Sequence, residues 1–178
     1  MATAPATTEK RAPTTTRQQF LDNFEREHAT TMRVLRAYPT DKLDLRPHAL
    51  CKTARELAWM FVMEQGMAEK ALTTGFDWST KPSGPPPAPE SFDQILGALE
   101  DGHKRVANIV SRMEEDQFFE TVKFFTAPKT IGDVTKIQIL WMALHDQIHH
   151  RGQFSIYLRM ADGKVPSIYG PSHDEPWM

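Results

Sequence analysis

Five prolines lie between Pro82 and Pro89, inside a segment, residues 73–90, that separates two stretches of helical pattern. Proline has no backbone N–H to donate and restricts its own φ, so this density excludes a helix or a central strand. The segment is expected to cross the surface as a stiff, largely extended chain. It is long enough to run from one end of a helical bundle to the other, and it therefore constrains the fold to two helical halves joined by a long crossover.

The first half contains two amphipathic helical patterns. Apolar residues recur at helical spacing from about Thr16 to Tyr38, which predicts the first helix. The second helix is expected to begin at Thr53, because Thr53-Ala-Arg-Glu56 fits the S/T-x-x-E capping box. Its apolar positions continue to about Leu72, where the proline-rich segment follows.

The second half contains two more helical patterns. The third helix opens at Ser91 with another capping-box pattern, and the fourth is expected to begin within residues 130–133 and to end near Ala161, with Gly163 as its C-cap. Apolar and polar residues alternate irregularly over residues 117–129, which leaves open a short strand pair or an irregular apolar cover. The prediction is an all-α four-helix bundle, with a long crossover between its second and third helices, as one domain over residues 16–178. Residues 1–15 are expected to form a flexible tail.

Composition narrows the class of protein. The 178 residues are 40% hydrophobic and 25% charged, with a net charge of -2, which fits one globular domain. This balance argues against a protein-wide attraction to nucleic acid or anionic membrane, and no apolar run is long enough for a membrane span. The single cysteine, Cys51, fits a reducing compartment. We therefore expect a soluble cytoplasmic protein with no nucleic-acid or membrane partner.

A polar cluster stands out in the fourth helix. Three of the seven histidines and one aspartate fall within residues 145–150. His145 and His149 are four residues apart, and so are Asp146 and His150. Residues four apart share a helix face, so each pair offers two donor atoms to one metal ion or one substrate.

The apolar stripe of the fourth helix indicates which pair faces the core. Extended from Ile139, it turns Asp146 and His150 inward and directs His145 and His149 toward a neighbouring helix.

The other helices also carry polar residues on their apolar faces, namely His28, Glu64 and His103. Buried charges need partners, so each of these is a candidate ligand or a hydrogen-bonded core residue.

Two neighbours of the cluster need separate explanations. Arg151 can orient a carboxylate through two parallel hydrogen bonds, or it can project into solvent. Gly152 costs a helix about 1 kcal/mol relative to alanine. Its presence suggests close approach of another backbone, either within the bundle or across a dimer contact.

Several segments resemble the DinB-like, or DNA-damage-inducible, superfamily. The resemblance covers residues 17–170 and rests on His149-His-Arg-Gly-Gln153, Tyr157-Leu-Arg159, Val165-Pro166, Ile168-Tyr-Gly170 and, in the second helix, Glu56-Leu-Ala-Trp-Met60. It implies a four-helix bundle, often dimeric, that holds a divalent metal through three histidines. One histidine comes from the second helix and two from the fourth. Characterised relatives include thiol-dependent transferases and isomerases, and nothing in the pattern implies DNA binding.

The chain departs from this family pattern at two of the three ligand positions. Aligned on Arg151-Gly-Gln, the fourth-helix ligands fall on Asp146 and His150, so one histidine is replaced by aspartate. The second-helix position falls on Met60, whose thioether is a poor ligand for a borderline divalent ion. Three alternatives remain: the metal is lost and the pocket reused, Asp146 and His150 are joined by Glu64 or His28, or His145 and His149 serve instead.

The resemblance and the polar interior lead to one functional hypothesis and one alternative. We expect a protein that holds zinc, nickel, iron or manganese and acts as a metal-dependent enzyme on a small molecule, as a thiol-dependent transferase or isomerase or as a hydrolase. The alternative is a non-catalytic bundle for ligand sensing or stress response with a degenerate metal site. A homodimer is expected in either case.

Overall fold

The structure is a computed structural model that describes residues 14–79, 84 and 86–178. Most of the predicted flexible tail, residues 1–13, lies outside the described residues. So do Pro82 and Pro85 of the predicted crossover.

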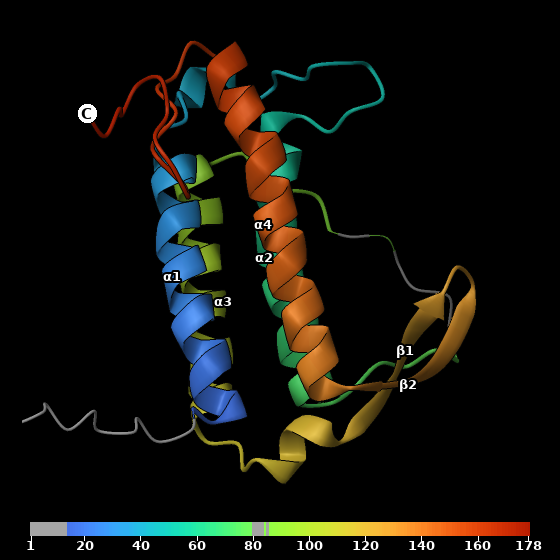
Figure 1. The fold of residues 1–178 in the computed structure, drawn as a ribbon. Coiled ribbons are helices and arrows are strands. Elements are labelled where there is room, and N and C mark those ends of the chain that lie inside the picture. Colours follow the sequence, from blue (N-terminus) through green and yellow to red (C-terminus); the bar gives the residue numbers. More distant parts are fainter. Residues whose placement is uncertain (1–13, 80–83, 85) are drawn as a thin grey trace, which may run out of the picture.

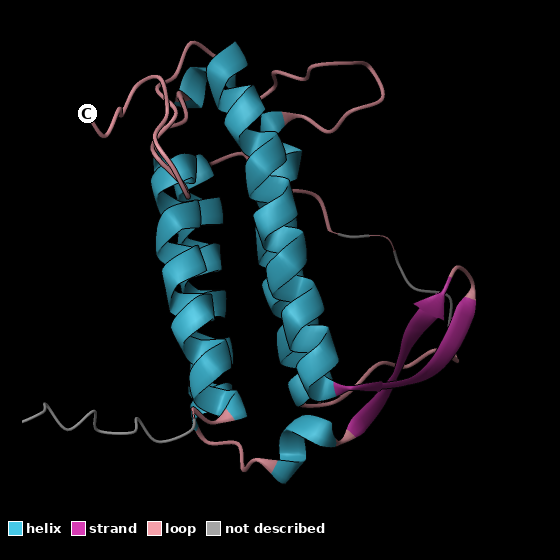
Figure 2. Ribbon diagram, in the orientation of Figure 1, coloured by secondary structure: helices cyan, strands magenta, loops and turns pink. Residues whose placement is uncertain are grey.

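Four long helices make up most of the described chain (Figure 2). A threonine or serine precedes each helix, and its hydroxyl accepts a hydrogen bond from a backbone N–H of the first turn, which fixes where the helix begins. The helices are α1 (Thr16–Arg36), α2 (Ala54–Leu72), α3 (Phe92–Ser111) and α4 (Lys136–Met160). Short 3-10 helices cover Thr40–Lys42 and Asp116–Phe119.

A β-hairpin corrects the all-α prediction. Strands β1 (Thr121–Ala127) and β2 (Thr130–Thr135) pair antiparallel, with Thr121 opposite Thr135 and Phe124 opposite Gly132. Of the two alternatives left open for residues 117–129, the strand pair is present. The expected start of the fourth helix within residues 130–133 is wrong, because these residues belong to β2. The helix begins at Lys136, after the Thr135 capping box.

The helices form a ring in the order α1, α3, α2, α4, and each contacts its two neighbours in that ring (Figure 1). Helices α1 and α4 run in one direction, and α2 and α3 run in the other. The chain must therefore return along the bundle between α2 and α3. The described parts of residues 73–90 are not helical, but the proline-rich crossover remains a prediction where residues 80–83 and 85 are concerned.

Two apolar clusters fill the bundle, one toward each end. One contains Leu35, Phe61 and Phe154, and the other contains Phe24, Val106 and Leu144. Between them lies a layer to which every helix contributes a buried or nearly buried polar side chain. We call these residues the polar layer: Glu27, His28, Thr31, Glu64, Gln65, His103, Gln147, His150 and Arg151.

No helix in the described part of the chain is long and apolar enough to cross a membrane.

Candidate metal centre

Arg151 lies inside the bundle. Its side chain is only 1% exposed, so the surface alternative for this residue is wrong. One guanidinium nitrogen, Nη2, donates to the Glu27 carboxylate at 2.7 Å and to the Tyr169 hydroxyl at 2.6 Å. The other, Nη1, donates to the Glu27 carbonyl at 3.1 Å and to the Thr31 hydroxyl at 3.3 Å. This network joins α4 to α1 and to the C-terminal segment. It therefore favours one orientation of α4 about its own axis.

That rotation places His150 between the core and solvent, facing α2. His150 Nδ1 lies 2.5 Å from Glu64 Oε1, and the two side chains are 14% and 4% exposed. The second carboxylate oxygen, Glu64 Oε2, is buried and has no hydrogen-bond partner among the described residues. A buried carboxylate oxygen without a partner is costly, so this atom is positioned for a proton or a cation.

Asp146 completes a three-residue group. One ligand atom from each of Glu64, Asp146 and His150 lies within 4.8 Å of the others. Asp146 itself is exposed, so the prediction that it turns into the core is wrong. It stands one turn before His150 at the edge of the bundle, and from there its carboxylate reaches the buried pair.

The pKa values of Glu64 and His150 are shifted because two carboxylates and one imidazole lie close together. Burial raises the pKa of Glu64 to about 7, the hydrogen bond to His150 opposes this change, and the charge of Asp146 adds to it. The Glu64 hydrogen bond raises the pKa of His150 above its ordinary value. Two ionised carboxylates this close repel each other, and a proton or a cation between them would relieve that repulsion.

These residues suit a divalent metal. Zinc binds imidazole nitrogen and carboxylate oxygen at about 2.0–2.2 Å, so donor atoms on one ion are separated by no more than about 4.4 Å. The ligand atoms of the group lie within 4.8 Å of one another, close to this limit. Glu64 Oε2 has no hydrogen-bond partner among the described residues, so its lone pairs are available to a metal ion. Mixed carboxylate and imidazole ligands are compatible with zinc, nickel, iron or manganese.

The other candidate ligands on α4, His145 and His149, do not join the group. His145 and His149 are both exposed on the outer side of the helix, and the described geometry brings neither to Glu64. His149 instead lies 2.9 Å from the amide of Gln153. The rotation of α4 that would make these histidines the ligand pair is therefore not observed.

His28 lies elsewhere in the polar layer. Its ring stacks on that of His103, with the centroids 3.8 Å apart and the planes 10° from parallel. Burial, together with the nearby His103, lowers the pKa of His28 to about 3. His103 Nε2 is 3.0 Å from a Glu25 carboxylate oxygen but lacks hydrogen-bond geometry. His28 and His103 are thus packed core residues, apart from the candidate centre.

Two residues that matter here escaped the sequence reasoning. Glu27 and Tyr169 share a hydrogen bond of 2.6 Å and both contact Arg151. Burial alone would raise the pKa of Glu27, but hydrogen bonds from Tyr169 and Arg151 hold it below its ordinary value. A signal for Glu27 was available, because it continues the apolar stripe at helical spacing from Phe20 and Phe24.

A cavity of about 470 Å³ adjoins the centre, with His150 in its lining. Met60, which stands at the family's second-helix ligand position, is not part of the three-residue group. It lines a neighbouring hollow of about 850 Å³ near the start of α2, which shares Leu50, Cys51 and Lys52 with the first cavity. Glu64, one turn further along α2, is the residue of this helix that belongs to the group.

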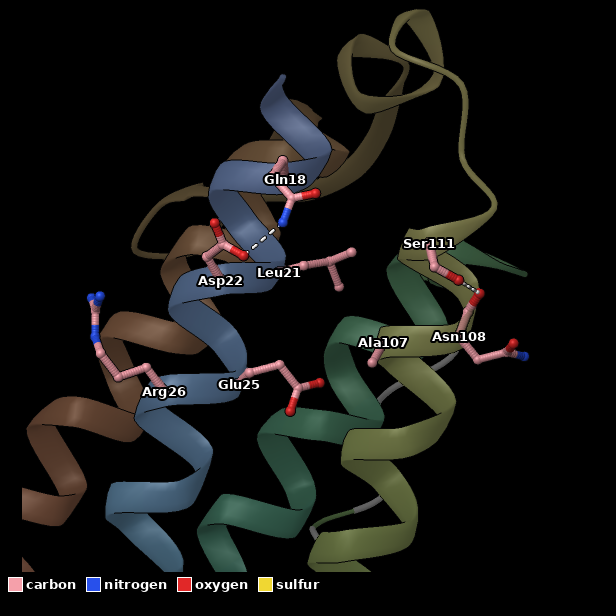
Figure 3. Close-up of a pocket in the computed structure, with 8 residues that line it drawn as sticks. All are labelled: Gln18, Leu21, Asp22, Glu25, Arg26, Ala107, Asn108 and Ser111. Carbon is pink, nitrogen blue, oxygen red and sulfur yellow. Dashed lines mark hydrogen bonds between the residues drawn. The ribbon is translucent and has the colours of Figure 1, made fainter. Parts of the chain in front are cut away.

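A different groove opens between α1 and α3 (Figure 3). Its residues are mostly exposed, and two of them, Gln18 and Asp22, hydrogen-bond to each other at 2.6 Å. The candidate centre lies between α2 and α4, on another side of the ring. Within the described residues, the groove contributes no three-residue group of metal ligands.

The fold and the site define a helical bundle with a carboxylate–histidine cluster at the edge of its polar layer. Such a cluster is typical of divalent-metal sites in helical bundles. The chain belongs to the DinB family, because the family model of that description matches residues 12–177.

Individual relatives agree with this assignment. The chain is 25% identical over 162 residues to Uncharacterized protein YrdA of Bacillus subtilis strain 168, which covers 90% of this chain and 92% of the relative. Among solved structures, a DinB-like protein from Bacillus cereus ATCC 10987 matches with a TM-score of 0.69 at 21% identity, covering 84% of this chain and 95% of its own. A DinB-like protein from Bacillus subtilis, YjoA, matches with a TM-score of 0.64 at 15% identity, covering 90% and 99%. At these identities, the structural likeness shows the fold alone.

Proposed function

We propose that the protein binds one divalent metal ion through Glu64, Asp146 and His150 and uses it to act on a small molecule. The unpartnered, buried Glu64 Oε2 beside His150 and Asp146 carries this proposal. The adjoining cavity gives a small molecule access to His150. A metal with an open coordination position would polarise a substrate oxygen or activate a bound water or thiol.

The protein's own residues would define the chemistry around such an ion. Glu64 is held in the interior by α2, so its position is rigid, whereas Asp146 is exposed and can move. Asp146 is therefore the better candidate to exchange a proton with solvent or substrate. This arrangement supports a thiol-dependent transferase or isomerase, or a hydrolase, and the reaction class remains part of the proposal.

The test is elemental analysis of the full chain, purified without a histidine tag. We expect about one equivalent of metal per chain. The Glu64→Gln and His150→Ala variants should lose most of it, and Asp146→Asn should bind more weakly, because each change removes one ligand.

His145→Ala and His149→Ala are matched controls, since both histidines lie on α4 within the same two turns but outside the group. They should retain the metal, and circular dichroism should show that all variants are helical. A parent protein without metal, even after reconstitution with zinc or nickel, would refute the proposal. So would loss of metal in the control variants alone.

We also propose a homodimer formed through the exposed face of α4. Nothing lies within 4 Å of a Cβ added to Gly152, so no packing contact among the described residues explains this glycine. Three large apolar side chains of α4 are also exposed: Met142 (39%), Ile156 (59%) and Met160 (47%). Light scattering after gel filtration should give a dimer for the parent and a monomer for Gly152→Gln. Ser155→Gln, on the same helix, should stay dimeric, and a monomeric parent would contradict the proposal.

A further inference from the structure

The 470 Å³ cavity beside His150 has an apolar wall and one charged residue at its rim. Leu57, Ile156 and Tyr157 supply apolar surface, and Lys52 lines the side formed by the loop before α2. The Tyr157 hydroxyl donates to the Lys52 carbonyl at 2.9 Å, which holds this loop residue against α4. The volume lies within the range of about 300–1,000 Å³ that is common for small-molecule sites and is too small for a folded partner.

The charge of this cavity is positive on the side of the loop. No carboxylate is among its lining residues. Lys52 is exposed and has no ion-pair partner among the described residues, whereas nearby Arg55 pairs with Asp44.

Among the described residues that line the cavity, Lys52 is the one lysine or arginine. At the N-terminus of α2, the capping box satisfies the Thr53 and Glu56 N–H groups, and the Leu45 and Leu43 carbonyls accept from the Ala54 and Arg55 N–H groups. A divalent ion on two carboxylates and one neutral imidazole carries no net charge. Lys52 then leaves a single positive charge facing the cavity, which matches a monoanion better than a dianion.

We propose that this cavity binds a small carboxylate with an apolar body, whose carboxylate pairs with Lys52 and whose body lies against Leu57 and Ile156. This names the substrate class of the site and rests on the proposed function for its account of a neutral metal centre. Lys52 is assigned as the residue that selects for the acid group.

The experiment is calorimetric titration of the full chain with hexanoate and with its neutral isostere hexanamide, in both zinc-loaded and chelator-treated protein. Hexanoate should bind more tightly than hexanamide. Lys52→Met should weaken hexanoate binding about tenfold in both states and leave hexanamide unchanged, because only the charged ligand loses a partner. Lys52→Arg should retain most of the affinity.

Two further variants separate the charge from the apolar wall. Lys104→Met removes an exposed lysine of α3 and should change nothing. Ile156→Ala should weaken hexanoate severalfold but leave the weak binding of acetate unchanged. Ile156 is 59% exposed, so this variant should fold.

Three outcomes would overturn the inference: equal affinity for hexanoate and hexanamide, unchanged hexanoate binding by Lys52→Met, or hexanoate binding that appears only with zinc and is independent of Lys52. The last result would place the carboxylate on the metal. The metal content of Lys52→Met should equal that of the parent. A parent without metal whose hexanoate binding still depends on Lys52 would refute the metal centre alone.

Discussion

At the scale of single residues, Arg151 is a charged side chain that lies buried inside the bundle, only 1% exposed. Its guanidinium is surrounded by the Glu27 carboxylate and carbonyl, the Thr31 hydroxyl and the Tyr169 hydroxyl. Each partner satisfies a donor that would otherwise be buried without a hydrogen bond. The arginine therefore holds three segments together: α1, α4 and the C-terminal segment.

Arg151→Met should lower the free energy of unfolding by about 3–5 kcal/mol, because it removes the buried cation that pairs with the Glu27 carboxylate and leaves only the exposed Arg26, at 3.5 Å. Denaturation with urea, followed by circular dichroism, measures this change. Arg159→Met is the control, because Arg159 pairs with Asp174 at the surface and should contribute about 1 kcal/mol or less. Equal losses in the two variants would mean that burial of the Arg151 pair is unimportant.

At the scale of elements, the turn that ends α4 depends on two residues, Asp162 and Gly163. The sequence predicts Gly163 as the C-cap, but Asp162 adopts the left-handed conformation, with φ of 62°. The Gly163 N–H then donates to the Leu158 carbonyl at 2.9 Å, and the Asp162 N–H donates to the Arg159 carbonyl at 3.1 Å. This pair of bonds is the Schellman pattern, with Asp162 at the position that glycine usually occupies.

Substitutions at these two positions should act in opposite directions. Asp162→Gly should raise the free energy of unfolding by about 0.5–1 kcal/mol, because glycine adopts positive φ without strain. Gly163→Ala should lower it by about 1–3 kcal/mol, since the added Cβ would lie 2.2 Å from Leu158 Cδ1. Thermal unfolding of both variants tests the pair. Stabilisation by alanine at Gly163 would contradict this account of the turn.

The β-hairpin, also at the scale of elements, is held by contacts with the segment that follows α2. Phe76 and Trp78 pack on Phe124, and the Trp78 indole donates to the Lys123 carbonyl at 2.8 Å. These contacts join the hairpin to the segment after α2, far away in sequence. A local pattern cannot reveal such a contact, so residues 117–129 remained ambiguous until the tertiary structure supplied the partner.

At the scale of the whole molecule, the polar layer crosses all four helices between two apolar clusters. It couples the stability of the bundle to pH through His28. With its folded pKa lowered to about 3, this histidine stays neutral in the folded protein while the unfolded chain takes up a proton below about pH 6.5. The unfolded state then binds more protons, so the contribution of His28 to stability is lost as the pH falls.

Glu64 acts in the opposite sense between about pH 4.5 and 7. Its folded pKa is raised, so its carboxyl group stays protonated to a higher pH in the folded protein than in the unfolded chain.

A comparison with a variant isolates the contribution of His28. Between pH 6.5 and 5, the parent should lose about 1 kcal/mol of unfolding free energy relative to His28→Asn. Urea denaturation at both pH values measures the difference. His145→Asn, which changes an exposed histidine, should track the parent, and an equal pH response of all three proteins would contradict the assignment.

The sequence alone determined that the chain forms four helices, and it placed Glu64, His103 and His150 on their interior faces. Helical spacing and capping residues are local properties, so they predicted four helices, and a family resemblance carried by strings such as His149-His-Arg-Gly-Gln153 predicted their arrangement. The grouping of Glu64 with Asp146 and His150 was one of three alternatives that the residues left open.

Only the tertiary structure showed which of these side chains lie together. The rotation of α4 depends on Arg151 finding Glu27 on α1 and Tyr169 in the C-terminal segment, and these partners are separated from it by 124 and 18 residues. That rotation brings His150 to Glu64 and leaves His145 and His149 in solvent. Helical periodicity defines a stripe to within about a residue, whereas a ligand set requires the direction of each side chain, and distant packing sets that direction.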